Sequence, residues 1–264
     1  MYRFFRQFRK NLIEKEHMQR YLLYSIGEIV LVVIGILLAL QVNSWNENRK
    51  DQEYLDFSLK EIHMDLKSDL RLIYGGIEPR LQAKEKGVKE LYSLMLQEEA
   101  PADSIFLEAY RGMNRGFLLS VSNGSYQSLK SRGLDIIKNE TLRNSIFNFY
   151  ENIIPRTLEF IHGRDEGLHQ KLADLEEEIF RFEIVQPEKG DPYHAKVPAL
   201  PDYIHGQALH RILDLNDDDA GHKRYRLRGL KNHYFDLMDI MEEEMTRRAI
   251  PFIRFDSTAV RADF

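Results

Sequence analysis

Cysteine is absent from the 264 residues of this chain. The absence excludes a disulfide framework and a thiolate metal site, and it suits any compartment, including an oxidising one where an unpaired thiol would be a liability. The sequence also lacks a GxxxxGK[ST] phosphate loop, a GxGxxG dinucleotide motif and a GxSxG nucleophile elbow. These absences argue against the enzymes that such motifs serve, and we predict a protein that is not an enzyme and needs no cofactor.

The part of the chain that follows the first twenty residues has no net positive charge. The formal net charge is -5, yet residues 1–20 hold six basic and only two acidic side chains. The rest of the chain is therefore acidic overall. Because phosphate backbones are bound by clustered positive charge, we do not expect nucleic acid as a partner.

One long apolar run is present, IGEIVLVVIGILLALQVNSWNE, at residues 26–47. From Tyr21 to Leu40 there are twenty residues in which Glu28 is the only charge. A helix rising about 1.5 Å per residue would span roughly 30 Å over this length, which matches the hydrocarbon core of a bilayer. Trp45 follows, where an indole ring prefers the headgroup level. We predict one transmembrane helix at residues 21–43, with the lipid bilayer as partner.

The flanks of the run favour an uncleaved signal anchor. A buried core helix is a poor alternative because the run is apolar on all faces, and no small-x-small cleavage site follows it. Six basic residues precede the run, whereas Arg49 and Lys50 are offset by three acids, so the N-terminus is predicted to be cytoplasmic. In a Gram-negative cell this places the chain in the inner membrane with a periplasmic body. Residues 1–20 fit either a basic amphipathic segment on an anionic leaflet or a disordered tail.

Glu28 is an expensive residue in this setting, at about 2.5–3.5 kcal/mol if it lay at mid-bilayer. Helical spacing places it on one stripe with Val32, Gly35, Ala39 and Val42. Gly35 and Ala39 form a small-xxx-small pair that lets a second helix approach closely. Glu28 would then serve self-association, docking to another inner-membrane protein, or a proton relay. We favour the first two, because polar residues commonly join membrane helices.

Helical periodicity continues through the body, residues 44–264. Leu55 to Ile73 repeat at spacings of three and four up to a predicted break at Tyr74-Gly75-Gly76. Further helices are predicted at 79–97, from 104, from Asn139 for about forty residues with a kink at Pro155, at 202–213 and at 219–248, with a loop at 183–201. No run alternates strongly enough to predict a strand of consequence. The predicted fold is all-α, one transmembrane helix continuing into an extracytoplasmic helical bundle.

Two segments carry a resemblance, YSIGEIVLVVIGILLALQVNSWNENRK and, downstream, YQSLKSRGLDIIKNETLRNSIFNFYE. Together they cover about a fifth of the chain, and the pair resembles a bacterial single-pass inner-membrane family of unknown function. The resemblance implies a short cytoplasmic start, one membrane helix and a helical extracytoplasmic domain. It also implies that Glu28, Gly35, Trp45 and Asn46 occupy motif positions, and it carries no reaction or ligand.

Two clusters invite a metal search. His162, Glu166 and His169 fall on one helical face, but glycines weaken the helix there and the HExxH context is missing, so we predict a solvated polar face and no metal. The run DLNDDDAG, residues 214–221, lacks the glycine and the final glutamate of a calcium loop. Its acids are predicted to cap the last helix, as Asp217, Asp218 and Asp219 at its N-terminus.

Three functions remain open. The leading hypothesis is a membrane-anchored, non-enzymatic helical protein that acts as a scaffold, a sensor-like module or an accessory subunit of a cell-envelope complex. It would be a homo-oligomer or dock to another inner-membrane protein through its membrane helix, and its bundle would meet an unknown periplasmic protein. The second hypothesis is a stator-like subunit of an ion-driven membrane machine that uses Glu28. The third is a periplasmic ligand-binding bundle with a pocket between helices.

Overall fold

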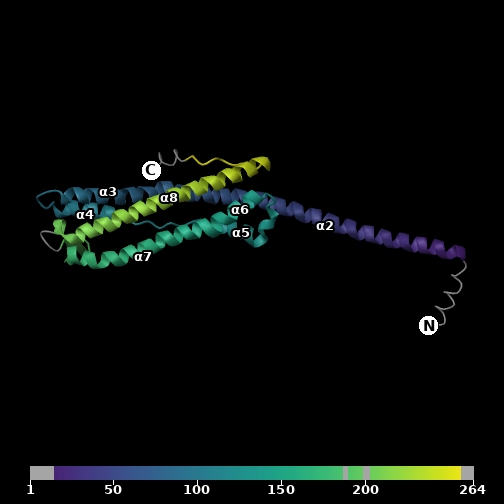
Figure 1. Ribbon diagram of the computed structural model, residues 1–264, viewed down its shortest axis with the longest axis horizontal. Helices are drawn as coiled ribbons and strands as arrows, with labels where there is room; N and C mark the ends of the chain where they lie inside the picture. The colour runs from purple at the N-terminus through teal and green to yellow at the C-terminus, as the bar shows by residue number, and fades with distance from the viewer. Residues whose placement is uncertain (1–14, 187–189, 199–202, 257–264) are drawn as a thin grey trace, which may run out of the picture. The chain divides into compact units, whose positions relative to one another are not determined.

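The structure, a computed structural model, describes residues 15–186, 190–198 and 203–256 (Figure 1). Helices account for most of this length, so the predicted helical fold is confirmed. The elements, in chain order, are α2 (Lys15–Leu72), η1 (Ile73–Ile77), α3 (Glu78–Met95), α4 (Asp103–Met113), α5 (Gly124–Arg132), η2 (Leu134–Ile136), α6 (Glu140–Asn148), η3 (Phe149–Ile153), α7 (Ile154–Ile179), β1 (Phe180–Val185), β2 (Tyr193–Pro198), η4 (Tyr203–His205) and α8 (Gln207–Arg247).

The chain divides into two compact units, Met1–Tyr54 and Leu55–Phe264. In the first unit the described residues belong to α2, and their apolar side chains are exposed, with Leu31 at 72% as an example. This helix is the one in the described chain that is long and apolar enough to cross a membrane. The predicted basic segment comprises residues 1–20, and its residues 1–14 lie outside the described part of the chain.

The second unit has its own core, and the predicted stripe of α2 forms part of it. The residues at spacings of three and four are all buried here, namely Leu55, Leu59, Ile62, Leu66, Leu70 and Ile73. A separate apolar cluster joins α3, α4, α7 and α8. Its centre holds Phe106, whose ring centroid lies 4.6 Å from that of Tyr203. Amphipathic helices have thus buried their apolar faces against one another, as expected for a bundle.

One π-helical turn replaces the predicted break, and a second lies at the position of the predicted kink. The backbone stays helical through Tyr74-Gly75-Gly76, because η1 joins α2 to α3, and η3 likewise joins α6 to α7 ahead of Pro155. Each turn is followed by an X-Pro pair that begins the next α-helix. Proline lacks an N–H and its ring clashes with the carbonyl four residues earlier, and a wider turn with bonds to the fifth residue relieves both problems.

The π turn before Pro155 also shifts the buried face by one residue. Ile154 donates its backbone N–H to the carbonyl of Phe149, five residues earlier. Phe149 is buried and the next buried aliphatic residue is Ile154, at 6% exposure, whereas Ile153 is half-buried. A uniform 3.6-residue period would place Ile153 on the buried face instead, so sequence periodicity does not detect this shift.

The C-terminal third differs from prediction in two further ways. Helix α8 runs without interruption from Gln207 to Arg247, where two helices were predicted, at 202–213 and 219–248. The predicted loop at 183–201 contains a strand, because β1 and β2 form an antiparallel hairpin in which Phe180 pairs with Pro198. Phe180 is buried against Tyr110 at 4.7 Å between ring centroids, while Phe182 and Ile184 are exposed. A single buried anchor gives too little alternation for sequence periodicity to detect.

Candidate functional site

The predicted membrane positions lie on the exposed surface of α2. Glu28, Gly35 and Ala39 are exposed, and Trp45 is 69% exposed. A Cβ added at Gly35 would meet no atom within 4 Å, so the surface is open there. Asn46 accepts a hydrogen bond from Arg49 at 3.4 Å. The structure brings none of these residues into mutual contact, and Glu28 makes no hydrogen bond or ion pair with the residues that the structure describes.

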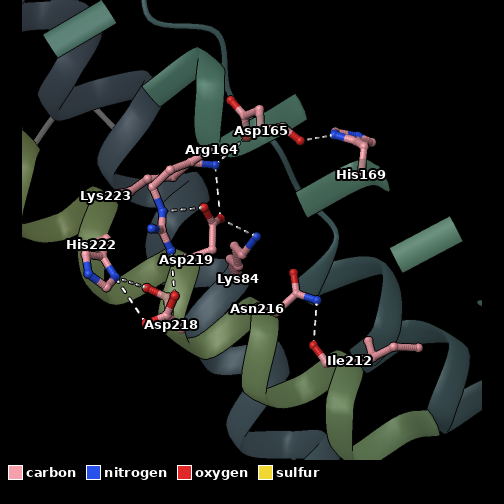
Figure 2. Close-up of polar contacts among 10 residues, drawn as sticks. All are labelled: Lys84, Arg164, Asp165, His169, Ile212, Asn216, Asp218, Asp219, His222 and Lys223. Atoms are coloured by element: carbon pink, nitrogen blue, oxygen red, sulfur yellow. Dashed lines mark hydrogen bonds and ion pairs between the residues drawn. The ribbon is translucent and has the colours of Figure 1, made fainter. Parts of the chain in front are cut away.

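A buried charged centre lies in the second unit, and it was not predicted. Asp219 of α8 accepts hydrogen bonds on Oδ2 from Lys84 of α3 at 2.9 Å and from Lys223 at 3.0 Å. Figure 2 shows these three side chains converging. All three are buried, with Asp219 at 1% exposure. Burying a lysine is expensive unless it is paired, so the two cations and their shared carboxylate depend on one another.

Helix α7 completes this centre with one cation and one anion (Figure 2). Lys223 also hydrogen-bonds Asp165, while Arg164 donates from Nη2 to Asp218 Oδ2 at 2.6 Å. The Nε of Arg164 lies 3.5 Å from Oδ1 of Asp219. Three cations therefore meet three carboxylates. The network joins α3, α7 and α8, and its charges balance.

The electrostatics of the centre follow from burial and pairing. Burial opposes ionisation of Asp219, but Lys84 and Lys223 outweigh it, so the pKa of this carboxyl lies below its usual value. Burial lowers the pKa of the Lys84 ammonium, and Asp219 offsets only part of that effect. With its acid ionised and bonded to two ammonium groups, the centre has the properties of a structural clamp.

This centre corrects the prediction for the acidic run at residues 214–221. Asp217, Asp218 and Asp219 do not cap a helix, because they lie in the interior of α8. Asp218 and Asp219 instead meet cations from neighbouring helices, while Asp217 is exposed. Partners that lie more than fifty residues away are invisible to a local capping rule.

The predicted metal candidates are exposed on α7. His162, Glu166 and His169 all face solvent, and Nδ1 of His169 hydrogen-bonds the backbone carbonyl of Asp165 at 2.7 Å. Across residues 15–186, 190–198 and 203–256, no group of three or more histidine, aspartate or glutamate side chains is placed to hold a metal ion. Their exposure is that of a solvated polar face.

A second buried polar centre surrounds Asp69 of α2. Its carboxylate accepts hydrogen bonds from the backbone N–H of Ser122 at 3.1 Å, from the hydroxyl of Ser122 at 2.9 Å and from the hydroxyl of Tyr234 at 3.0 Å. Burial raises the pKa of Asp69 to about 6, and these hydrogen bonds offset only part of the burial effect. Asp69 therefore titrates near neutral pH, and it ties α2 to α8 and to the loop before α5.

The two ends of the second segment that carries the family resemblance, residues 126–151, contact each other near Asp69. Tyr126 stacks on Tyr150 with ring centroids 4.4 Å apart and planes 6° apart. Glu151 accepts hydrogen bonds from the Tyr126 hydroxyl at 2.8 Å and from Lys130 at 2.7 Å. The Tyr150 hydroxyl is buried and finds no hydrogen-bond partner among the described atoms. Residues at the two ends of the segment that runs from Tyr126 to Glu151 are therefore in contact.

A groove between α7 and α8 was also missed by sequence reasoning. It encloses about 500 Å³, and its lining includes Arg156, Arg226 and Arg228 but no aspartate or glutamate among the described residues. The signal is the stretch HKRYRLRGLKNH, residues 222–233, which holds five lysine or arginine residues and no acid. Averaging charge over the whole acidic body concealed this local excess.

Comparison with known proteins identifies a family and nothing more specific. Residues 28–175, more than half of the chain, match a family described as a family of unknown function, DUF6090. The chain therefore belongs to this family, which agrees with the resemblance to a family of unknown function. The matched range includes both recognised segments from Glu28 onward. No curated protein and no solved structure matches the chain.

Proposed function

We propose that this member of the DUF6090 family is a membrane-anchored, non-enzymatic helical protein that acts by contact, as a scaffold, a sensor-like module or an accessory subunit of a cell-envelope complex. One observation carries the proposal. The described aliphatic side chains of α2 before residue 44 are exposed around the whole helix, from Val33 at 47% to Leu31 at 72%, whereas the unit from Leu55 onward buries its own core.

The exposed surface is too apolar for water. Burying a leucine or isoleucine side chain is worth about 1.5–3 kcal/mol, and this helix leaves more than ten large apolar side chains uncovered. A helix of a water-soluble bundle would bury at least one stripe. A bilayer covers every face at once, so it is the environment that fits this helix best.

The orientation rests on charge. The six basic residues before the helix favour a cytoplasmic N-terminus, and the body would then lie in the periplasm, held at the inner membrane by a signal anchor. A fusion of alkaline phosphatase, which folds only where disulfides form, should be active at the C-terminus of the full chain. A green fluorescent protein fusion at the same place should be dark. The opposite pattern would reverse the proposed topology.

Contact within the membrane would use the stripe that contains Glu28, Gly35 and Ala39. Ala39 lines a shallow groove on the helix surface together with Val42, Asn43 and Asn46. Small residues there allow close helix approach, and Glu28 would find a hydrogen-bond partner on the opposing helix. The partner would be a second copy of this chain or another inner-membrane protein.

Single cysteines test this packing face, since the chain has no cysteine of its own. Gly35→Cys and Ala39→Cys should crosslink efficiently in native membranes, to the same chain or to another protein. Val33→Cys and Leu37→Cys, about 200° away around the helix, should not. Equal crosslinking at all four positions would contradict the proposed packing face.

A second function is favoured by one property of Glu28. It is the only charge between Tyr21 and Leu40 and has no partner among the described residues. An isolated membrane carboxylate is also what a proton carrier requires, as in a stator-like subunit of an ion-driven machine. Glu28→Gln separates the two functions, because an amide preserves hydrogen bonding but cannot carry a proton.

A further inference from the structure

The groove between α7 and α8 is basic, and no aspartate or glutamate among the described residues lines it. Arg156 enters it from α7, and Arg226 and Arg228 enter it from α8. All three side chains are exposed. The groove beside it on α8, which Arg228 also lines, contains acids and pairs Arg224 with Glu85 and Lys231 with Glu78. Arg156 and Arg226 thus face a space without an anion, and Arg228 lies between that space and the acid-lined groove.

The groove arginines are available as well as clustered. Arg156, Arg226 and Arg228 form no ion pair with any residue that the structure describes. Arg226 instead rests on the ring of Phe160, with its guanidinium carbon 4.4 Å from the ring centroid. A cation–π contact orders the side chain while leaving its charge and its N–H groups free for an oxyanion.

The π turn η3, which runs directly into α7, also contributes to the lining. Asn148 precedes this turn, Asn152 lies within it, and both line the groove. Their amides are already linked, since Asn152 donates to Asn148 at 3.1 Å, which leaves further N–H groups for a ligand. Single π turns inside α-helices occur frequently at functional sites. The site is therefore marked by backbone geometry as well as by charge.

Gly229 keeps the middle of the groove open. It lies on α8 between Arg228 and Leu230, and a Cβ added there would meet no atom within 4 Å. Glycine in the interior of a helix costs up to about 1 kcal/mol relative to alanine, so an open glycine here sacrifices stability. The space above it is part of a volume of about 500 Å³, which is within the range of small-molecule sites.

We propose that this groove binds a small soluble ligand carrying two or more phosphate groups, held by Arg156, Arg226 and Arg228 with the amides of Asn148 and Asn152. Guanidinium groups present paired N–H donors that match phosphate oxygens, and three of them suit a multiply charged ligand better than a single carboxylate. The site goes beyond a role by contact alone, because it gives the body a chemical signal to respond to.

Isothermal titration of the full chain in non-ionic detergent, with inorganic pyrophosphate at low ionic strength, tests the proposal. Pyrophosphate should bind the wild-type protein with a stoichiometry of one per chain. Removing one arginine, as Arg156→Gln or Arg228→Gln, should weaken binding about tenfold or more. The matched control is Arg111→Gln on α4, which removes the same charge from an exposed residue outside the groove and should leave the affinity unchanged.

Two glycine variants test the location without changing any charge. Gly229→Leu should fill the groove and weaken pyrophosphate binding about tenfold or more, whereas Gly229→Ala should have a much smaller effect. Circular dichroism of each variant checks that the helical content is retained. Absence of wild-type binding, or equal affinity in Arg228→Gln, Gly229→Leu and Arg111→Gln, overturns the site. Binding of citrate as tight as that of pyrophosphate overturns the phosphate class.

Discussion

The ammonium of Lys84 lies 2.9 Å from Oδ2 of Asp219, although 135 residues separate them in the chain. Both side chains are buried, and Lys223 approaches the same oxygen at 3.0 Å. A carboxylate shared by two ammonium groups makes the helices that supply them interdependent. The centre should therefore show a definite order of sensitivity to substitution.

Asp219→Asn should destabilise the body by about 3–5 kcal/mol, because it leaves Lys84 buried without its anion and leaves Lys223 with Asp165 alone. Lys84→Met should cost less, since Lys223 still neutralises Asp219. Urea unfolding of the full chain in non-ionic detergent, followed by circular dichroism, measures both. Lys86→Met, which removes an exposed lysine paired with Glu90 on the same helix, is the control and should change stability by about 1 kcal/mol or less. Equal small effects at all three positions would refute the buried clamp.

Asp69 should make stability depend on pH between about 4 and 6. Its pKa in the folded chain is raised to about 6, above the value near 3.8 expected when unfolded. The folded state therefore holds this proton more tightly, so the contribution is fully present below the unfolded pKa and is lost as pH rises through about 6. The loss is at most about 3 kcal/mol for a shift of about two units.

Asp69→Asn removes this titration while keeping an acceptor oxygen for Ser122, and it offers Tyr234 an N–H in place of the oxygen that accepts from its hydroxyl. The unfolding free energy of the wild-type protein, relative to that of the variant, should fall as pH rises from about 4 to about 6. Parallel pH profiles for the two proteins would mean that Asp69 does not titrate as described.

Gly87 lies where α3 and α4 approach most closely. A Cβ at this position would lie 2.7 Å from the carbonyl oxygen of Ala109 and 2.9 Å from the Cα of Met113, both backbone atoms. Gly87→Ala should therefore destabilise the body by about 1–3 kcal/mol, despite the higher helix propensity of alanine. Gly163→Ala on α7 is the matched control, since its Cβ meets nothing within 4 Å and it should stabilise by about 0.5–1 kcal/mol. Urea unfolding should give opposite signs, and a stabilising Gly87→Ala would contradict the close approach.

Glu28 should tolerate an amide if it joins helices. In a Gly35→Cys background, Glu28→Gln should keep most of the crosslinking in native membranes, whereas Glu28→Ala should lower it, because only the amide retains donors and acceptors. The interhelical bond is worth about 0.6–2 kcal/mol, so a several-fold change in yield is expected. Loss of crosslinking in Glu28→Gln that matches the loss in Glu28→Ala would point to the ionised carboxylate instead.

Rules that consider only neighbouring residues, such as helix capping and hydrophobic periodicity, predicted the features of this fold that depend on neighbouring residues. The side chain of Asn139, where a helix was predicted to begin, caps α6 by accepting from Leu142 N–H at 3.2 Å. The buried stripe from Leu55 to Ile73 follows from periodicity in the same way. Each of these features depends on neighbours within a few residues.

The features that were missed depend on distant neighbours. Asp219 can be buried because Lys84 and Arg164, which come from other helices, pair with its carboxylate. A rule that considers only the local acidic run does not include these partners. The Arg156 and Arg228 groove needs the pairing of α7 with α8, which periodicity does not specify. Rules for helix breakers predict a break at Gly75 and Gly76 because they compare only an α-helix with a turn, and the π turn is a third possibility.

The π turn between Phe149 and Ile154 has a consequence for how this family can change over evolution. It holds one residue more than the regular spacing between buried positions requires, and Pro155 is the reason that residue is tolerated. A relative that lost this proline would regain an ordinary helix only by deleting a single residue in the same place. A gap of one position paired with the absence of proline is thus the signature to seek among homologous sequences.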